Sequence, residues 1–230
     1  MGAATARHLA ARGAKVALVG IDAENVEAVR REIEAAGGTA LDLAVDVSAP
    51  KAVAEAVQRT VAAFGGLHFG VNCAGIACPW LATGEIEPAD WLKVINVNLD
   101  GVFYSMRYEI PEILSSGGGA IVNISSVWFT RGMGGRSSYT AAKHGVAGLT
   151  RAAANEYARQ NLRVNSVAPG IIDTPMIGTD AASSAEVANA TPMGRIGRPE
   201  EIADAVAFLL SDKASYISGV VLPVDGAFVA

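Results

Sequence analysis

Residues 120–143 read Ala-Ile-Val-Asn-Ile-Ser-Ser-Val-Trp-Phe-Thr-Arg-Gly-Met-Gly-Gly-Arg-Ser-Ser-Tyr-Thr-Ala-Ala-Lys. The apolar run at the start of this stretch, over 120–125, is typical of a buried strand. Its last part opens a helix that is predicted over 138–159. Strands of this kind, buried on both faces, belong to parallel sheets, so the stretch predicts an α/β protein.

Tyr139 and Lys143 lie four residues apart on this helix and therefore share one face. A positive charge beside a phenol favours the phenolate, so we expect Lys143 to lower the pKa of Tyr139 from about 10 toward the working pH. Such a pair suits proton transfer to or from an alcohol or carbonyl oxygen. Ser126, which follows the strand, is placed to hydrogen-bond the same oxygen.

The same pair also has a purely structural interpretation. Tyr139 would then be a half-buried aromatic residue, and the stem of Lys143 would lie along an apolar surface with its charge in water. The position of Ser126 directly after the preceding strand favours the catalytic interpretation.

The chain has 230 residues, of which 51% are hydrophobic and 18% charged. This length suits a single domain with a large core, and the composition is unlike that of a disordered chain. The net charge is −5 without any basic cluster, so nucleic-acid binding has no electrostatic support. Apolar runs are too short to span a membrane and no export signal is found, so we expect no membrane association and a cytoplasmic location.

Cysteine and histidine are scarce in the sequence. Cys73 and Cys78 are expected to be buried free thiols, and the three histidines are scattered. Together they form no metal-ligand spacing, so no metal site is predicted.

Predicted helices and strands alternate along the whole chain. Helices are expected over 2–12, 22–36 (capped by Asp22), 48–64 (capped by Ser48), 88–114, 138–159 and 199–211. Strands are expected over 15–21, 39–47, 67–72, 120–125, 162–168 and 219–224, with an irregular segment over 171–193. This order predicts a single-domain, doubly wound parallel sheet of Rossmann-like type, which binds ligands at the carboxyl ends of its strands.

Ser126, Tyr139 and Lys143, together with the turns after the predicted strands, resemble the short-chain dehydrogenase/reductase family over nearly the whole chain. Within it they resemble the 3-oxoacyl-carrier-protein reductases and related alcohol dehydrogenases. The turns that carry the resemblance are Asp46-Val47, Asn72-Cys-Ala-Gly75 and Pro169-Gly-Ile-Ile-Asp-Thr174. The resemblance implies that Tyr139 is the general acid/base, that Lys143 lowers its pKa and holds the nicotinamide ribose, and that Ser126 polarises the substrate oxygen.

The resemblance also implies contacts with a nicotinamide cofactor. Asp46 would receive the adenine amino group, although it also has the alternative role of a helix cap. Gly75 would let the backbone approach the ribose, and the backbone of Ile172 and the hydroxyl of Thr174 would hold the nicotinamide amide. The implied cofactor-binding residues are Gly2, Asp22, Asp46, Val47, Asn72, Ala74, Gly75, Tyr139, Lys143, Pro169, Gly170, Ile172 and Thr174.

Asn98 matches the fourth catalytic residue of the family, an Asn that holds a water in a proton relay toward the lysine. Asn96 is the competing candidate, but the Gly three residues after Asn98 favours Asn98. An Asn within the helix expected over 88–114 also indicates a local kink, near Gly101.

The start of the chain departs from the family pattern. The family begins with a strand and a Thr-Gly-x-x-x-Gly-x-Gly loop that meets the cofactor pyrophosphate. Here Met1-Gly2 aligns with the last two positions of that loop. We therefore expect a sheet without its first strand and with little of the Gly-rich loop, and we hypothesise that the natural protein has roughly 10–20 more residues upstream.

Cofactor choice depends on the residues after the strand over 15–21. The acidic residue that would accept the ribose 2′-hydroxyl aligns with Gly20, and Asp22 follows two residues later. No Lys or Arg lies between Gly20 and Glu24 to pair with a 2′-phosphate. The sequence therefore favours NAD(H) over NADP(H).

These observations predict an NAD(P)(H)-dependent oxidoreductase that interconverts a secondary alcohol and a ketone. An apolar substrate is suggested by large side chains flanking the expected pocket, with ordinary packing as the alternative: Trp80, Trp128, Phe129 and Met176. The resemblance further implies a homotetramer. A catalytically silent scaffold or regulatory binding protein is the rival interpretation. A hydrolase using Ser126 is a more distant one, since no His or oxyanion motif is placed to activate that serine.

Overall fold

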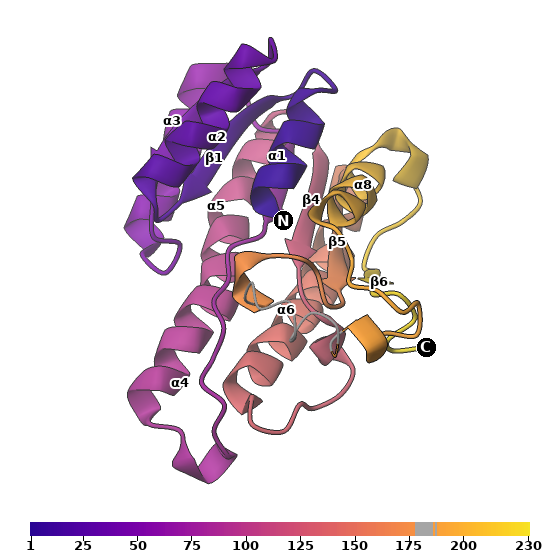
Figure 1. Cartoon of the computed structure of the whole chain (residues 1–230). Helices are drawn as coiled ribbons and strands as arrows, with labels where there is room; N and C mark the ends of the chain where they lie inside the picture. The colour runs from indigo at the N-terminus through magenta and orange to yellow at the C-terminus, as the bar shows by residue number, and fades with distance from the viewer. Residues whose placement is uncertain (178–185, 187) are drawn as a thin grey trace.

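The computed structural model describes residues 1–177, 186 and 188–230, so part of the segment expected to be irregular lies outside the described residues. Helices and strands alternate along the chain (Figure 1). The strands are β1 (Lys15–Gly20), β2 (Thr39–Ala44), β3 (Phe69–Asn72), β4 (Gly119–Ile124), β5 (Leu162–Pro169) and β6 (Val221–Val224). The helices are α1 (Gly2–Ala10), α2 (Ala23–Ala35), α3 (Pro50–Phe64), α4 (Pro88–Ile95), α5 (Gly101–Ser115), α6 (Ser137–Tyr157) and α8 (Pro199–Leu210).

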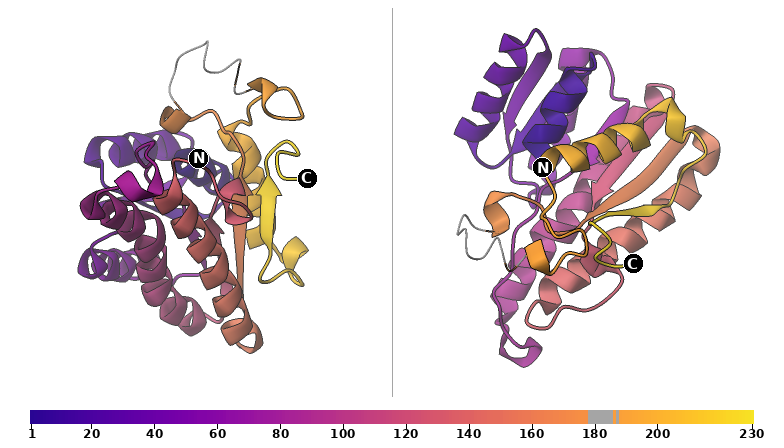
Figure 2. Two further views of the ribbon diagram at one scale, coloured as in Figure 1. Left: turned by 90° about the horizontal axis from the view of Figure 1, so that it is seen from below. Right: turned by 45° about the vertical axis from the view of Figure 1, so that its right-hand side comes forward.

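All the strand pairs of the described chain are parallel, and helices cover both faces of the strands. Helices α1, α2 and α8 pack on one face, and α3, α5 and α6 pack on the other (Figures 1 and 2). The doubly wound, Rossmann-like α/β fold predicted from the alternating pattern is therefore confirmed.

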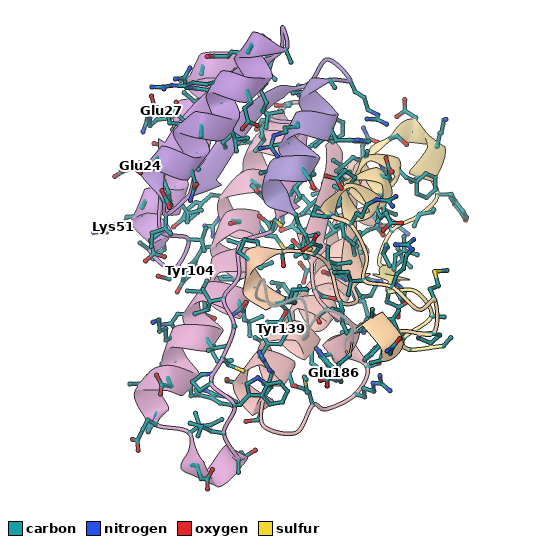
Figure 3. The ribbon with its side chains drawn as sticks, viewed as in Figure 1. Glu24, Glu27, Lys51, Tyr104, Tyr139 and Glu186 are labelled. Carbon is teal, nitrogen blue, oxygen red and sulfur yellow. The ribbon has the colours of Figure 1, made fainter. Side chains whose placement is uncertain are left out.

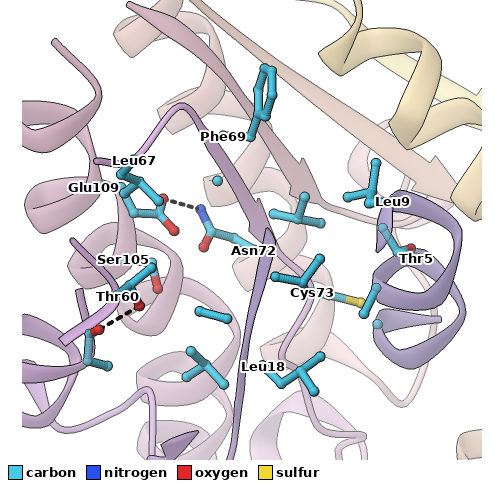
Figure 4. Close-up of a pocket in the computed structure, with 18 of the residues that line it drawn as sticks. Thr5, Leu9, Leu18, Thr60, Leu67, Phe69, Asn72, Cys73, Ser105 and Glu109 are labelled. Carbon is cyan, nitrogen blue, oxygen red and sulfur yellow. Dashed lines mark hydrogen bonds between the residues drawn. The ribbon is translucent and has the colours of Figure 1, made fainter. Parts of the chain in front are cut away.

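The sheet is divided between β1 and β3. β1 pairs with β2, while β3 begins a separate run in the order β3-β4-β5-β6. A cavity of about 830 Å³ lies between the two halves, lined by Leu18 of β1, Val71 of β3 and side chains from α1, α3 and α5 (Figure 4). Neighbouring strands lie about 4.8 Å apart, and unpaired strand edges expose backbone N–H and C=O groups. The cavity thus lies at the point where the hydrogen-bonded order of the strands is broken.

Two helix starts differ in how they are capped. Asp22 caps α2 as predicted, because its Oδ1 accepts a hydrogen bond from the backbone N–H of Asn25 at 3.1 Å. The predicted Ser48 cap is wrong, since α3 begins at Pro50 with Ala49 as the N-cap. Asp46 holds the backbone N–H and hydroxyl of Ser48 at 2.9 and 2.7 Å, and this turn delays the helix.

The long helix expected over 88–114 is interrupted by one π-helical turn. α4 ends at Ile95, the turn Asn96–Asp100 follows, and α5 begins at Gly101. The predicted kink near Gly101 is confirmed. A side chain at Gly101 would lie 2.8 Å from a methyl group of Val47, so the glycine lets α5 approach the turn after β2.

Among the described residues, no helix has the length and apolar character that crossing a membrane requires.

Candidate active site

Strand β4 and helix α6 bring Ser126, Tyr139 and Lys143 into one place. Ser126 follows the end of β4, and Tyr139 and Lys143 lie on the first turns of α6 (Figure 3). The ammonium of Lys143 lies 5.5 Å from the centre of the Tyr139 ring and donates a hydrogen bond to the carbonyl of Ile124 at 2.9 Å. Lys143 is only 4% exposed, so its charge does not extend into water, and the purely structural interpretation fails for it.

The pKa of Tyr139 moves in the direction opposite to the expected one. Burial of the phenol raises the pKa, and the neighbouring Ser126 hydroxyl and the charge of Arg136 lower it only in part. The predicted lowering by Lys143 is therefore wrong for this structure, because desolvation of the phenolate is the largest effect and the positive charge that lowers the pKa is that of Arg136. Tyr139 is a neutral phenol at neutral pH and holds a proton that it can donate.

Burial also shifts the pKa of Lys143 in the direction that disfavours its charged form. Burial lowers its pKa to about 8, although the neighbouring Cys73 raises it. Near neutral pH most of its ammonium form persists, whereas about one pH unit above this value most of it is lost. The charge beside Tyr139 is therefore sensitive to pH in the range of enzymatic work.

Asn98 anchors the turn after β3 to the π-helical turn. Its side-chain amide donates to the carbonyls of Ile76 and Val94 at 3.1 and 3.0 Å, and its oxygen accepts from the Ile76 N–H at 3.1 Å. A Cβ added at Gly75 would lie 2.7 Å from the Asn98 oxygen and 3.8 Å from the Lys143 ammonium. Asn98, Gly75 and Lys143 therefore lie close together at this turn.

A chain of buried polar side chains runs from this turn under the sheet, and the sequence gives no local signal for it. The Asn72 amide donates to Glu109 of α5 at 3.2 Å and to Asn123 of β4 at 2.9 Å, and Asn123 donates to Thr150 of α6 at 3.0 Å. Burial raises the pKa of Glu109 to about 7, while the bond from Asn72 lowers it. The predicted cofactor residue Asn72 thus has its side chain engaged inside the protein (Figure 4).

The other turns of the β1–β3 side lie around the start of α1. A Cβ at Gly2 would lie 3.6 Å from the sulfur of Cys73, so the N-terminus of α1 faces the Cys73-Ala74 turn. Asp22 and Asp46 follow β1 and β2, and both hold neighbouring donors of their own turns. Asp22 caps α2, whereas the helix-cap alternative given for Asp46 is wrong, since Ala49 is the N-cap of α3 and Asp46 forms the turn before it.

The turn after β5 places Pro169, Gly170, Ile172 and Thr174 at the carboxyl end of the sheet. Gly170 has no room for a side chain, because a Cβ would lie 2.7 Å from the Asp225 backbone. Ile172 forms an isolated parallel bridge with Gly197. In this bridge the Gly197 N–H donates to the Ile171 carbonyl, and the Asp173 N–H donates to the Gly197 carbonyl. The Ile172 N–H therefore points away from Gly197. The Ile172 carbonyl accepts a hydrogen bond from the Thr174 hydroxyl at 3.2 Å.

Aromatic side chains surround the loop between Ser126 and α6. Trp80 is 61% exposed and lies under the Arg136 guanidinium, with 4.1 Å from Cζ to the ring centre. Trp128 meets Phe228 edge to face at 5.8 Å between ring centres. Phe129 instead packs against buried side chains of the core, so the packing alternative holds for it. Phe228 and Arg136 were not foreseen as neighbours of the site, because both contacts join distant parts of the chain.

The large cavity lies next to the candidate active site. The residues that line the 830 Å³ cavity include Gly2, Val47, Asn72 and Ala74 but not Ser126, Tyr139 or Lys143, so the cavity adjoins the site rather than containing it. In the part of the chain that the structure describes, no three His, Cys, Asp or Glu side chains gather as a metal-binding group.

Comparison with known proteins extends over nearly the whole chain. The family model described as enoyl-(acyl carrier protein) reductase matches residues 1–228. Cyclohexanol dehydrogenase of Acinetobacter sp. (strain SE19) is 46% identical over 100% of this chain and 91% of its own length. Cis-4-hydroxycyclohexanecarboxylate dehydrogenase of Sinomonas cyclohexanicum is also 46% identical, over 100% of this chain and 92% of its own length.

The solved structures agree with these relatives. The crystal structure of levodione reductase superposes with a TM-score of 0.94 at 39% identity, covering 98% of this chain and 92% of that one. The chain belongs to the short-chain dehydrogenase/reductase family and is an oxidoreductase of alcohol and ketone groups.

Proposed function

We propose that this chain interconverts a cyclic secondary alcohol and the corresponding cyclic ketone, with NAD(H) as the cofactor. The observation that carries the proposal is the group formed by the buried Ser126 and Lys143 and the half-buried Tyr139, with the lysine ammonium 5.5 Å from the phenol ring. The relatives named for cyclohexanol and hydroxycyclohexanecarboxylate support a six-membered ring as the substrate. Trp80 and Trp128 lie beside the loop between Ser126 and α6, and their ring edges would offer apolar contacts to such a substrate.

In the direction of reduction, Tyr139 donates its proton to the carbonyl oxygen while Ser126 donates a hydrogen bond to the same oxygen. The raised pKa of Tyr139 suits this role, since the phenol is protonated at neutral pH. Lys143 stabilises the phenolate that forms, because its ammonium lies next to the ring. In the direction of oxidation the same phenolate removes the alcohol proton. The bound nicotinamide cofactor supplies or accepts the hydride.

Asn98 is proposed to act through the turn that it holds. Two hydrogen bonds join its side chain to the backbone of Ile76 and a third joins it to the carbonyl of Val94, and together they keep the Gly75 turn beside Lys143. A water bound at this turn would connect the Lys143 ammonium to solvent, as the family resemblance implies. Asn98 therefore supports the proton path rather than touching the substrate.

The nicotinamide half of a cofactor fits the residues present. Gly75 leaves open the point next to Lys143 that a side chain would fill, and the bridge of Ile172 with Gly197 turns the Ile172 N–H away from Gly197. Lys143 would hold the nicotinamide ribose, and Ile172 with Thr174 would hold the amide. For the adenosine half, Asp22 and Asp46 lie after β1 and β2, and no Lys or Arg lies over 20–24; these features support NAD(H).

A homotetramer is the assembly we propose, on family resemblance and on the outer surface of α6. Ala141, Gly148 and Ala152 are exposed on α6, and a side chain at Gly148 would meet nothing within 4 Å. Phe103 of the neighbouring α5 is 47% exposed. Small exposed residues on α6 permit close helix packing between copies. Light scattering that gives the mass of one 23.6 kDa chain would contradict this assembly.

The function is tested by oxidation of cyclohexanol with NAD⁺ and with NADP⁺, followed through the absorbance of the reduced cofactor. We expect turnover with NAD⁺, and a fall on the order of 10²–10⁴-fold when Tyr139→Phe removes the proton carrier. Tyr157→Phe, near the other end of α6, is the matched control and is expected to keep full activity. A folded chain that oxidises no cyclic alcohol would overturn the proposal and favour a silent scaffold.

A further inference from the structure

Arg136 lies directly before α6, one helical turn from Tyr139, at the N-cap position. The backbone of Arg136 is non-helical, with φ −138° and ψ 42°, so the position of its guanidinium is set by the loop and by its stack on Trp80. The charge of Arg136 also lowers the pKa of Tyr139, which places it within electrostatic reach of the proposed acid. Arg136 is thus part of the surroundings of the reacting oxygen, although the mechanism above does not use it.

Trp80 holds the guanidinium in place. Arg136 Cζ lies 4.1 Å from the centre of the Trp80 ring, and the loop of Trp80 is fixed by a bond from the Leu81 N–H to the Gly135 carbonyl at 3.1 Å. A guanidinium stacked on an indole uses its flat face, which leaves its N–H groups directed outward in its own plane. These donors match the two oxygens of a carboxylate.

The donors at this point lack acceptors among the described residues. The Nε of Arg136 is buried without a hydrogen-bond partner, and the same is true of the hydroxyls of Ser137 and Ser138. Ser138 is only 1% exposed. None of the ion pairs within the described ranges includes Arg136. The two terminal Nη groups of Arg136 are not buried in this way and make no hydrogen bond to any described residue, so they are the donors that an anion can reach.

The position of the charge is itself unfavourable for the helix. A cation at a helix N-terminus opposes the helix dipole, and the first turn of α6 contains no acidic residue to compensate. The stability of the helix therefore gives no reason for an arginine here. A bound anion would reverse this penalty, since it would interact favourably with both the guanidinium and the dipole.

We propose that Arg136 is a specificity-determining residue that binds a carboxylate of the substrate. The preferred substrates are then cyclic alcohols and ketones that carry a carboxylate on a ring carbon away from the reacting one. The reacting oxygen lies at Tyr139 and Ser126, and the carboxylate lies on Arg136 beside Trp80. This inference rests on the proposed function, because it names the substrate class of the same site.

Arg131 provides a matched control from the same loop. Its Cζ lies 5.4 Å from the Trp128 ring centre and 4.9 Å from that of Phe228, and its Nη2 donates to the Phe228 carbonyl at 3.3 Å. Arg131 therefore has the same charge and a similar aromatic environment, but it is engaged in holding the C-terminal segment. Removing its charge tests for a general electrostatic effect without touching Arg136.

The first test measures binding of cyclohexanecarboxylate and of its neutral analogue cyclohexanecarboxamide by tryptophan fluorescence, with and without NADH. For the unmodified chain we expect the carboxylate to bind roughly tenfold or more tightly than the amide. Arg136→Gln should abolish this preference, Arg136→Lys should keep part of it, and Arg131→Gln should keep all of it. Equal binding of the two probes by the unmodified chain would overturn the inference, as would a preference that survives Arg136→Gln or an absence of binding by a folded chain.

The second test separates this inference from the proposed function. It compares kcat/KM for 4-oxocyclohexanecarboxylate with kcat/KM for cyclohexanone, and the ratio of the two should fall roughly tenfold in Arg136→Gln. Reduction of both ketones with equal efficiency by the unmodified chain would leave the proposed function standing and overturn the role of Arg136. Carboxylate-selective binding without turnover of either ketone would support Arg136 and contradict the proposed function.

Discussion

The two halves of the divided sheet differ in how completely they are packed. In the half formed by β3 to β6, strands and helices share two core clusters of ten buried residues each, and the proposed catalytic side chains lie at the strand ends. The half formed by β1 and β2 shares one cluster of four buried residues, Ala6, Ala10, Leu18 and Ile33. The 830 Å³ cavity separates the halves. The residues proposed for catalysis therefore belong to the half of the sheet that is well packed.

The largest expected effect concerns the charge beside Tyr139. Lys143→Met removes the ammonium but keeps an apolar side chain of similar length in its buried position. We expect kcat to fall on the order of 10²-fold or more, because the phenolate loses its stabilising charge. Steady-state kinetics give kcat, and circular dichroism shows whether the β3–β6 half stays folded. Unchanged kcat in a folded variant would contradict the role of Lys143.

The next effect compares one truncation in each half. Leu162→Ala in β5 removes a side chain that is 1% exposed within a closely packed cluster, so we expect a loss of about 2–5 kcal/mol in the free energy of unfolding. Leu18→Ala in β1 borders the cavity and should cost less than half as much. Urea unfolding of both variants measures the difference. Equal losses would mean that the two halves are equally well packed.

Glu109 lines the cavity and should make stability depend on pH. Its pKa rises from 4.5 to about 7 on folding, so the folded state binds the extra proton between these values. The contribution of protonated Glu109 to the free energy of unfolding is therefore fully present below pH 4.5. It is lost as the pH rises through 7, which lowers the free energy of unfolding by up to about 3 kcal/mol. Glu109→Gln cannot ionise, so its stability should fall less between pH 5 and 8 than that of the unmodified chain. Parallel pH curves for the two proteins would show that the carboxyl is not desolvated.

The smallest expected effect tests the meeting point of Asn98 and Lys143. Gly75→Ala places a methyl group 2.7 Å from the Asn98 oxygen, which should cost about 1–3 kcal/mol of stability and lower kcat. Gly84→Ala is the control, because a side chain there would meet nothing within 4 Å. Thermal unfolding and kinetics of the two variants give the contrast. A Gly75→Ala variant that behaves like Gly84→Ala would remove the argument for close contact at this turn.

Local patterns were sufficient to predict the alternating elements and part of the proposed catalytic group. The i, i+4 spacing places Tyr139 and Lys143 on one face of α6 from local pattern alone, whereas the position of Ser126 beside them was expected from the family resemblance. The cap at Asp22 and the kink at Asn98 were also predictable, since each depends on neighbouring backbone groups.

The features that the sequence missed depend on distant contacts. The bond between Asn72 and Glu109 joins β3 to α5, and the stack of Arg136 on Trp80 joins two loops. The direction of the Tyr139 pKa depends on its burial by several elements, which spacing along α6 does not reveal. The Ser48 cap failed for a local reason, because Asp46 competes for the serine hydroxyl and N–H.

The most direct test of the central claim, that the β3–β6 half holds a working nicotinamide site, is the binding of NADH to this chain. Quenching of tryptophan fluorescence would follow the titration in the unmodified chain and in Lys143→Met. We expect saturable binding that is weaker in the variant, because Lys143 lies beside the point that Gly75 leaves open. A folded chain that binds no NADH, or binds it equally well without the Lys143 ammonium, would contradict the account.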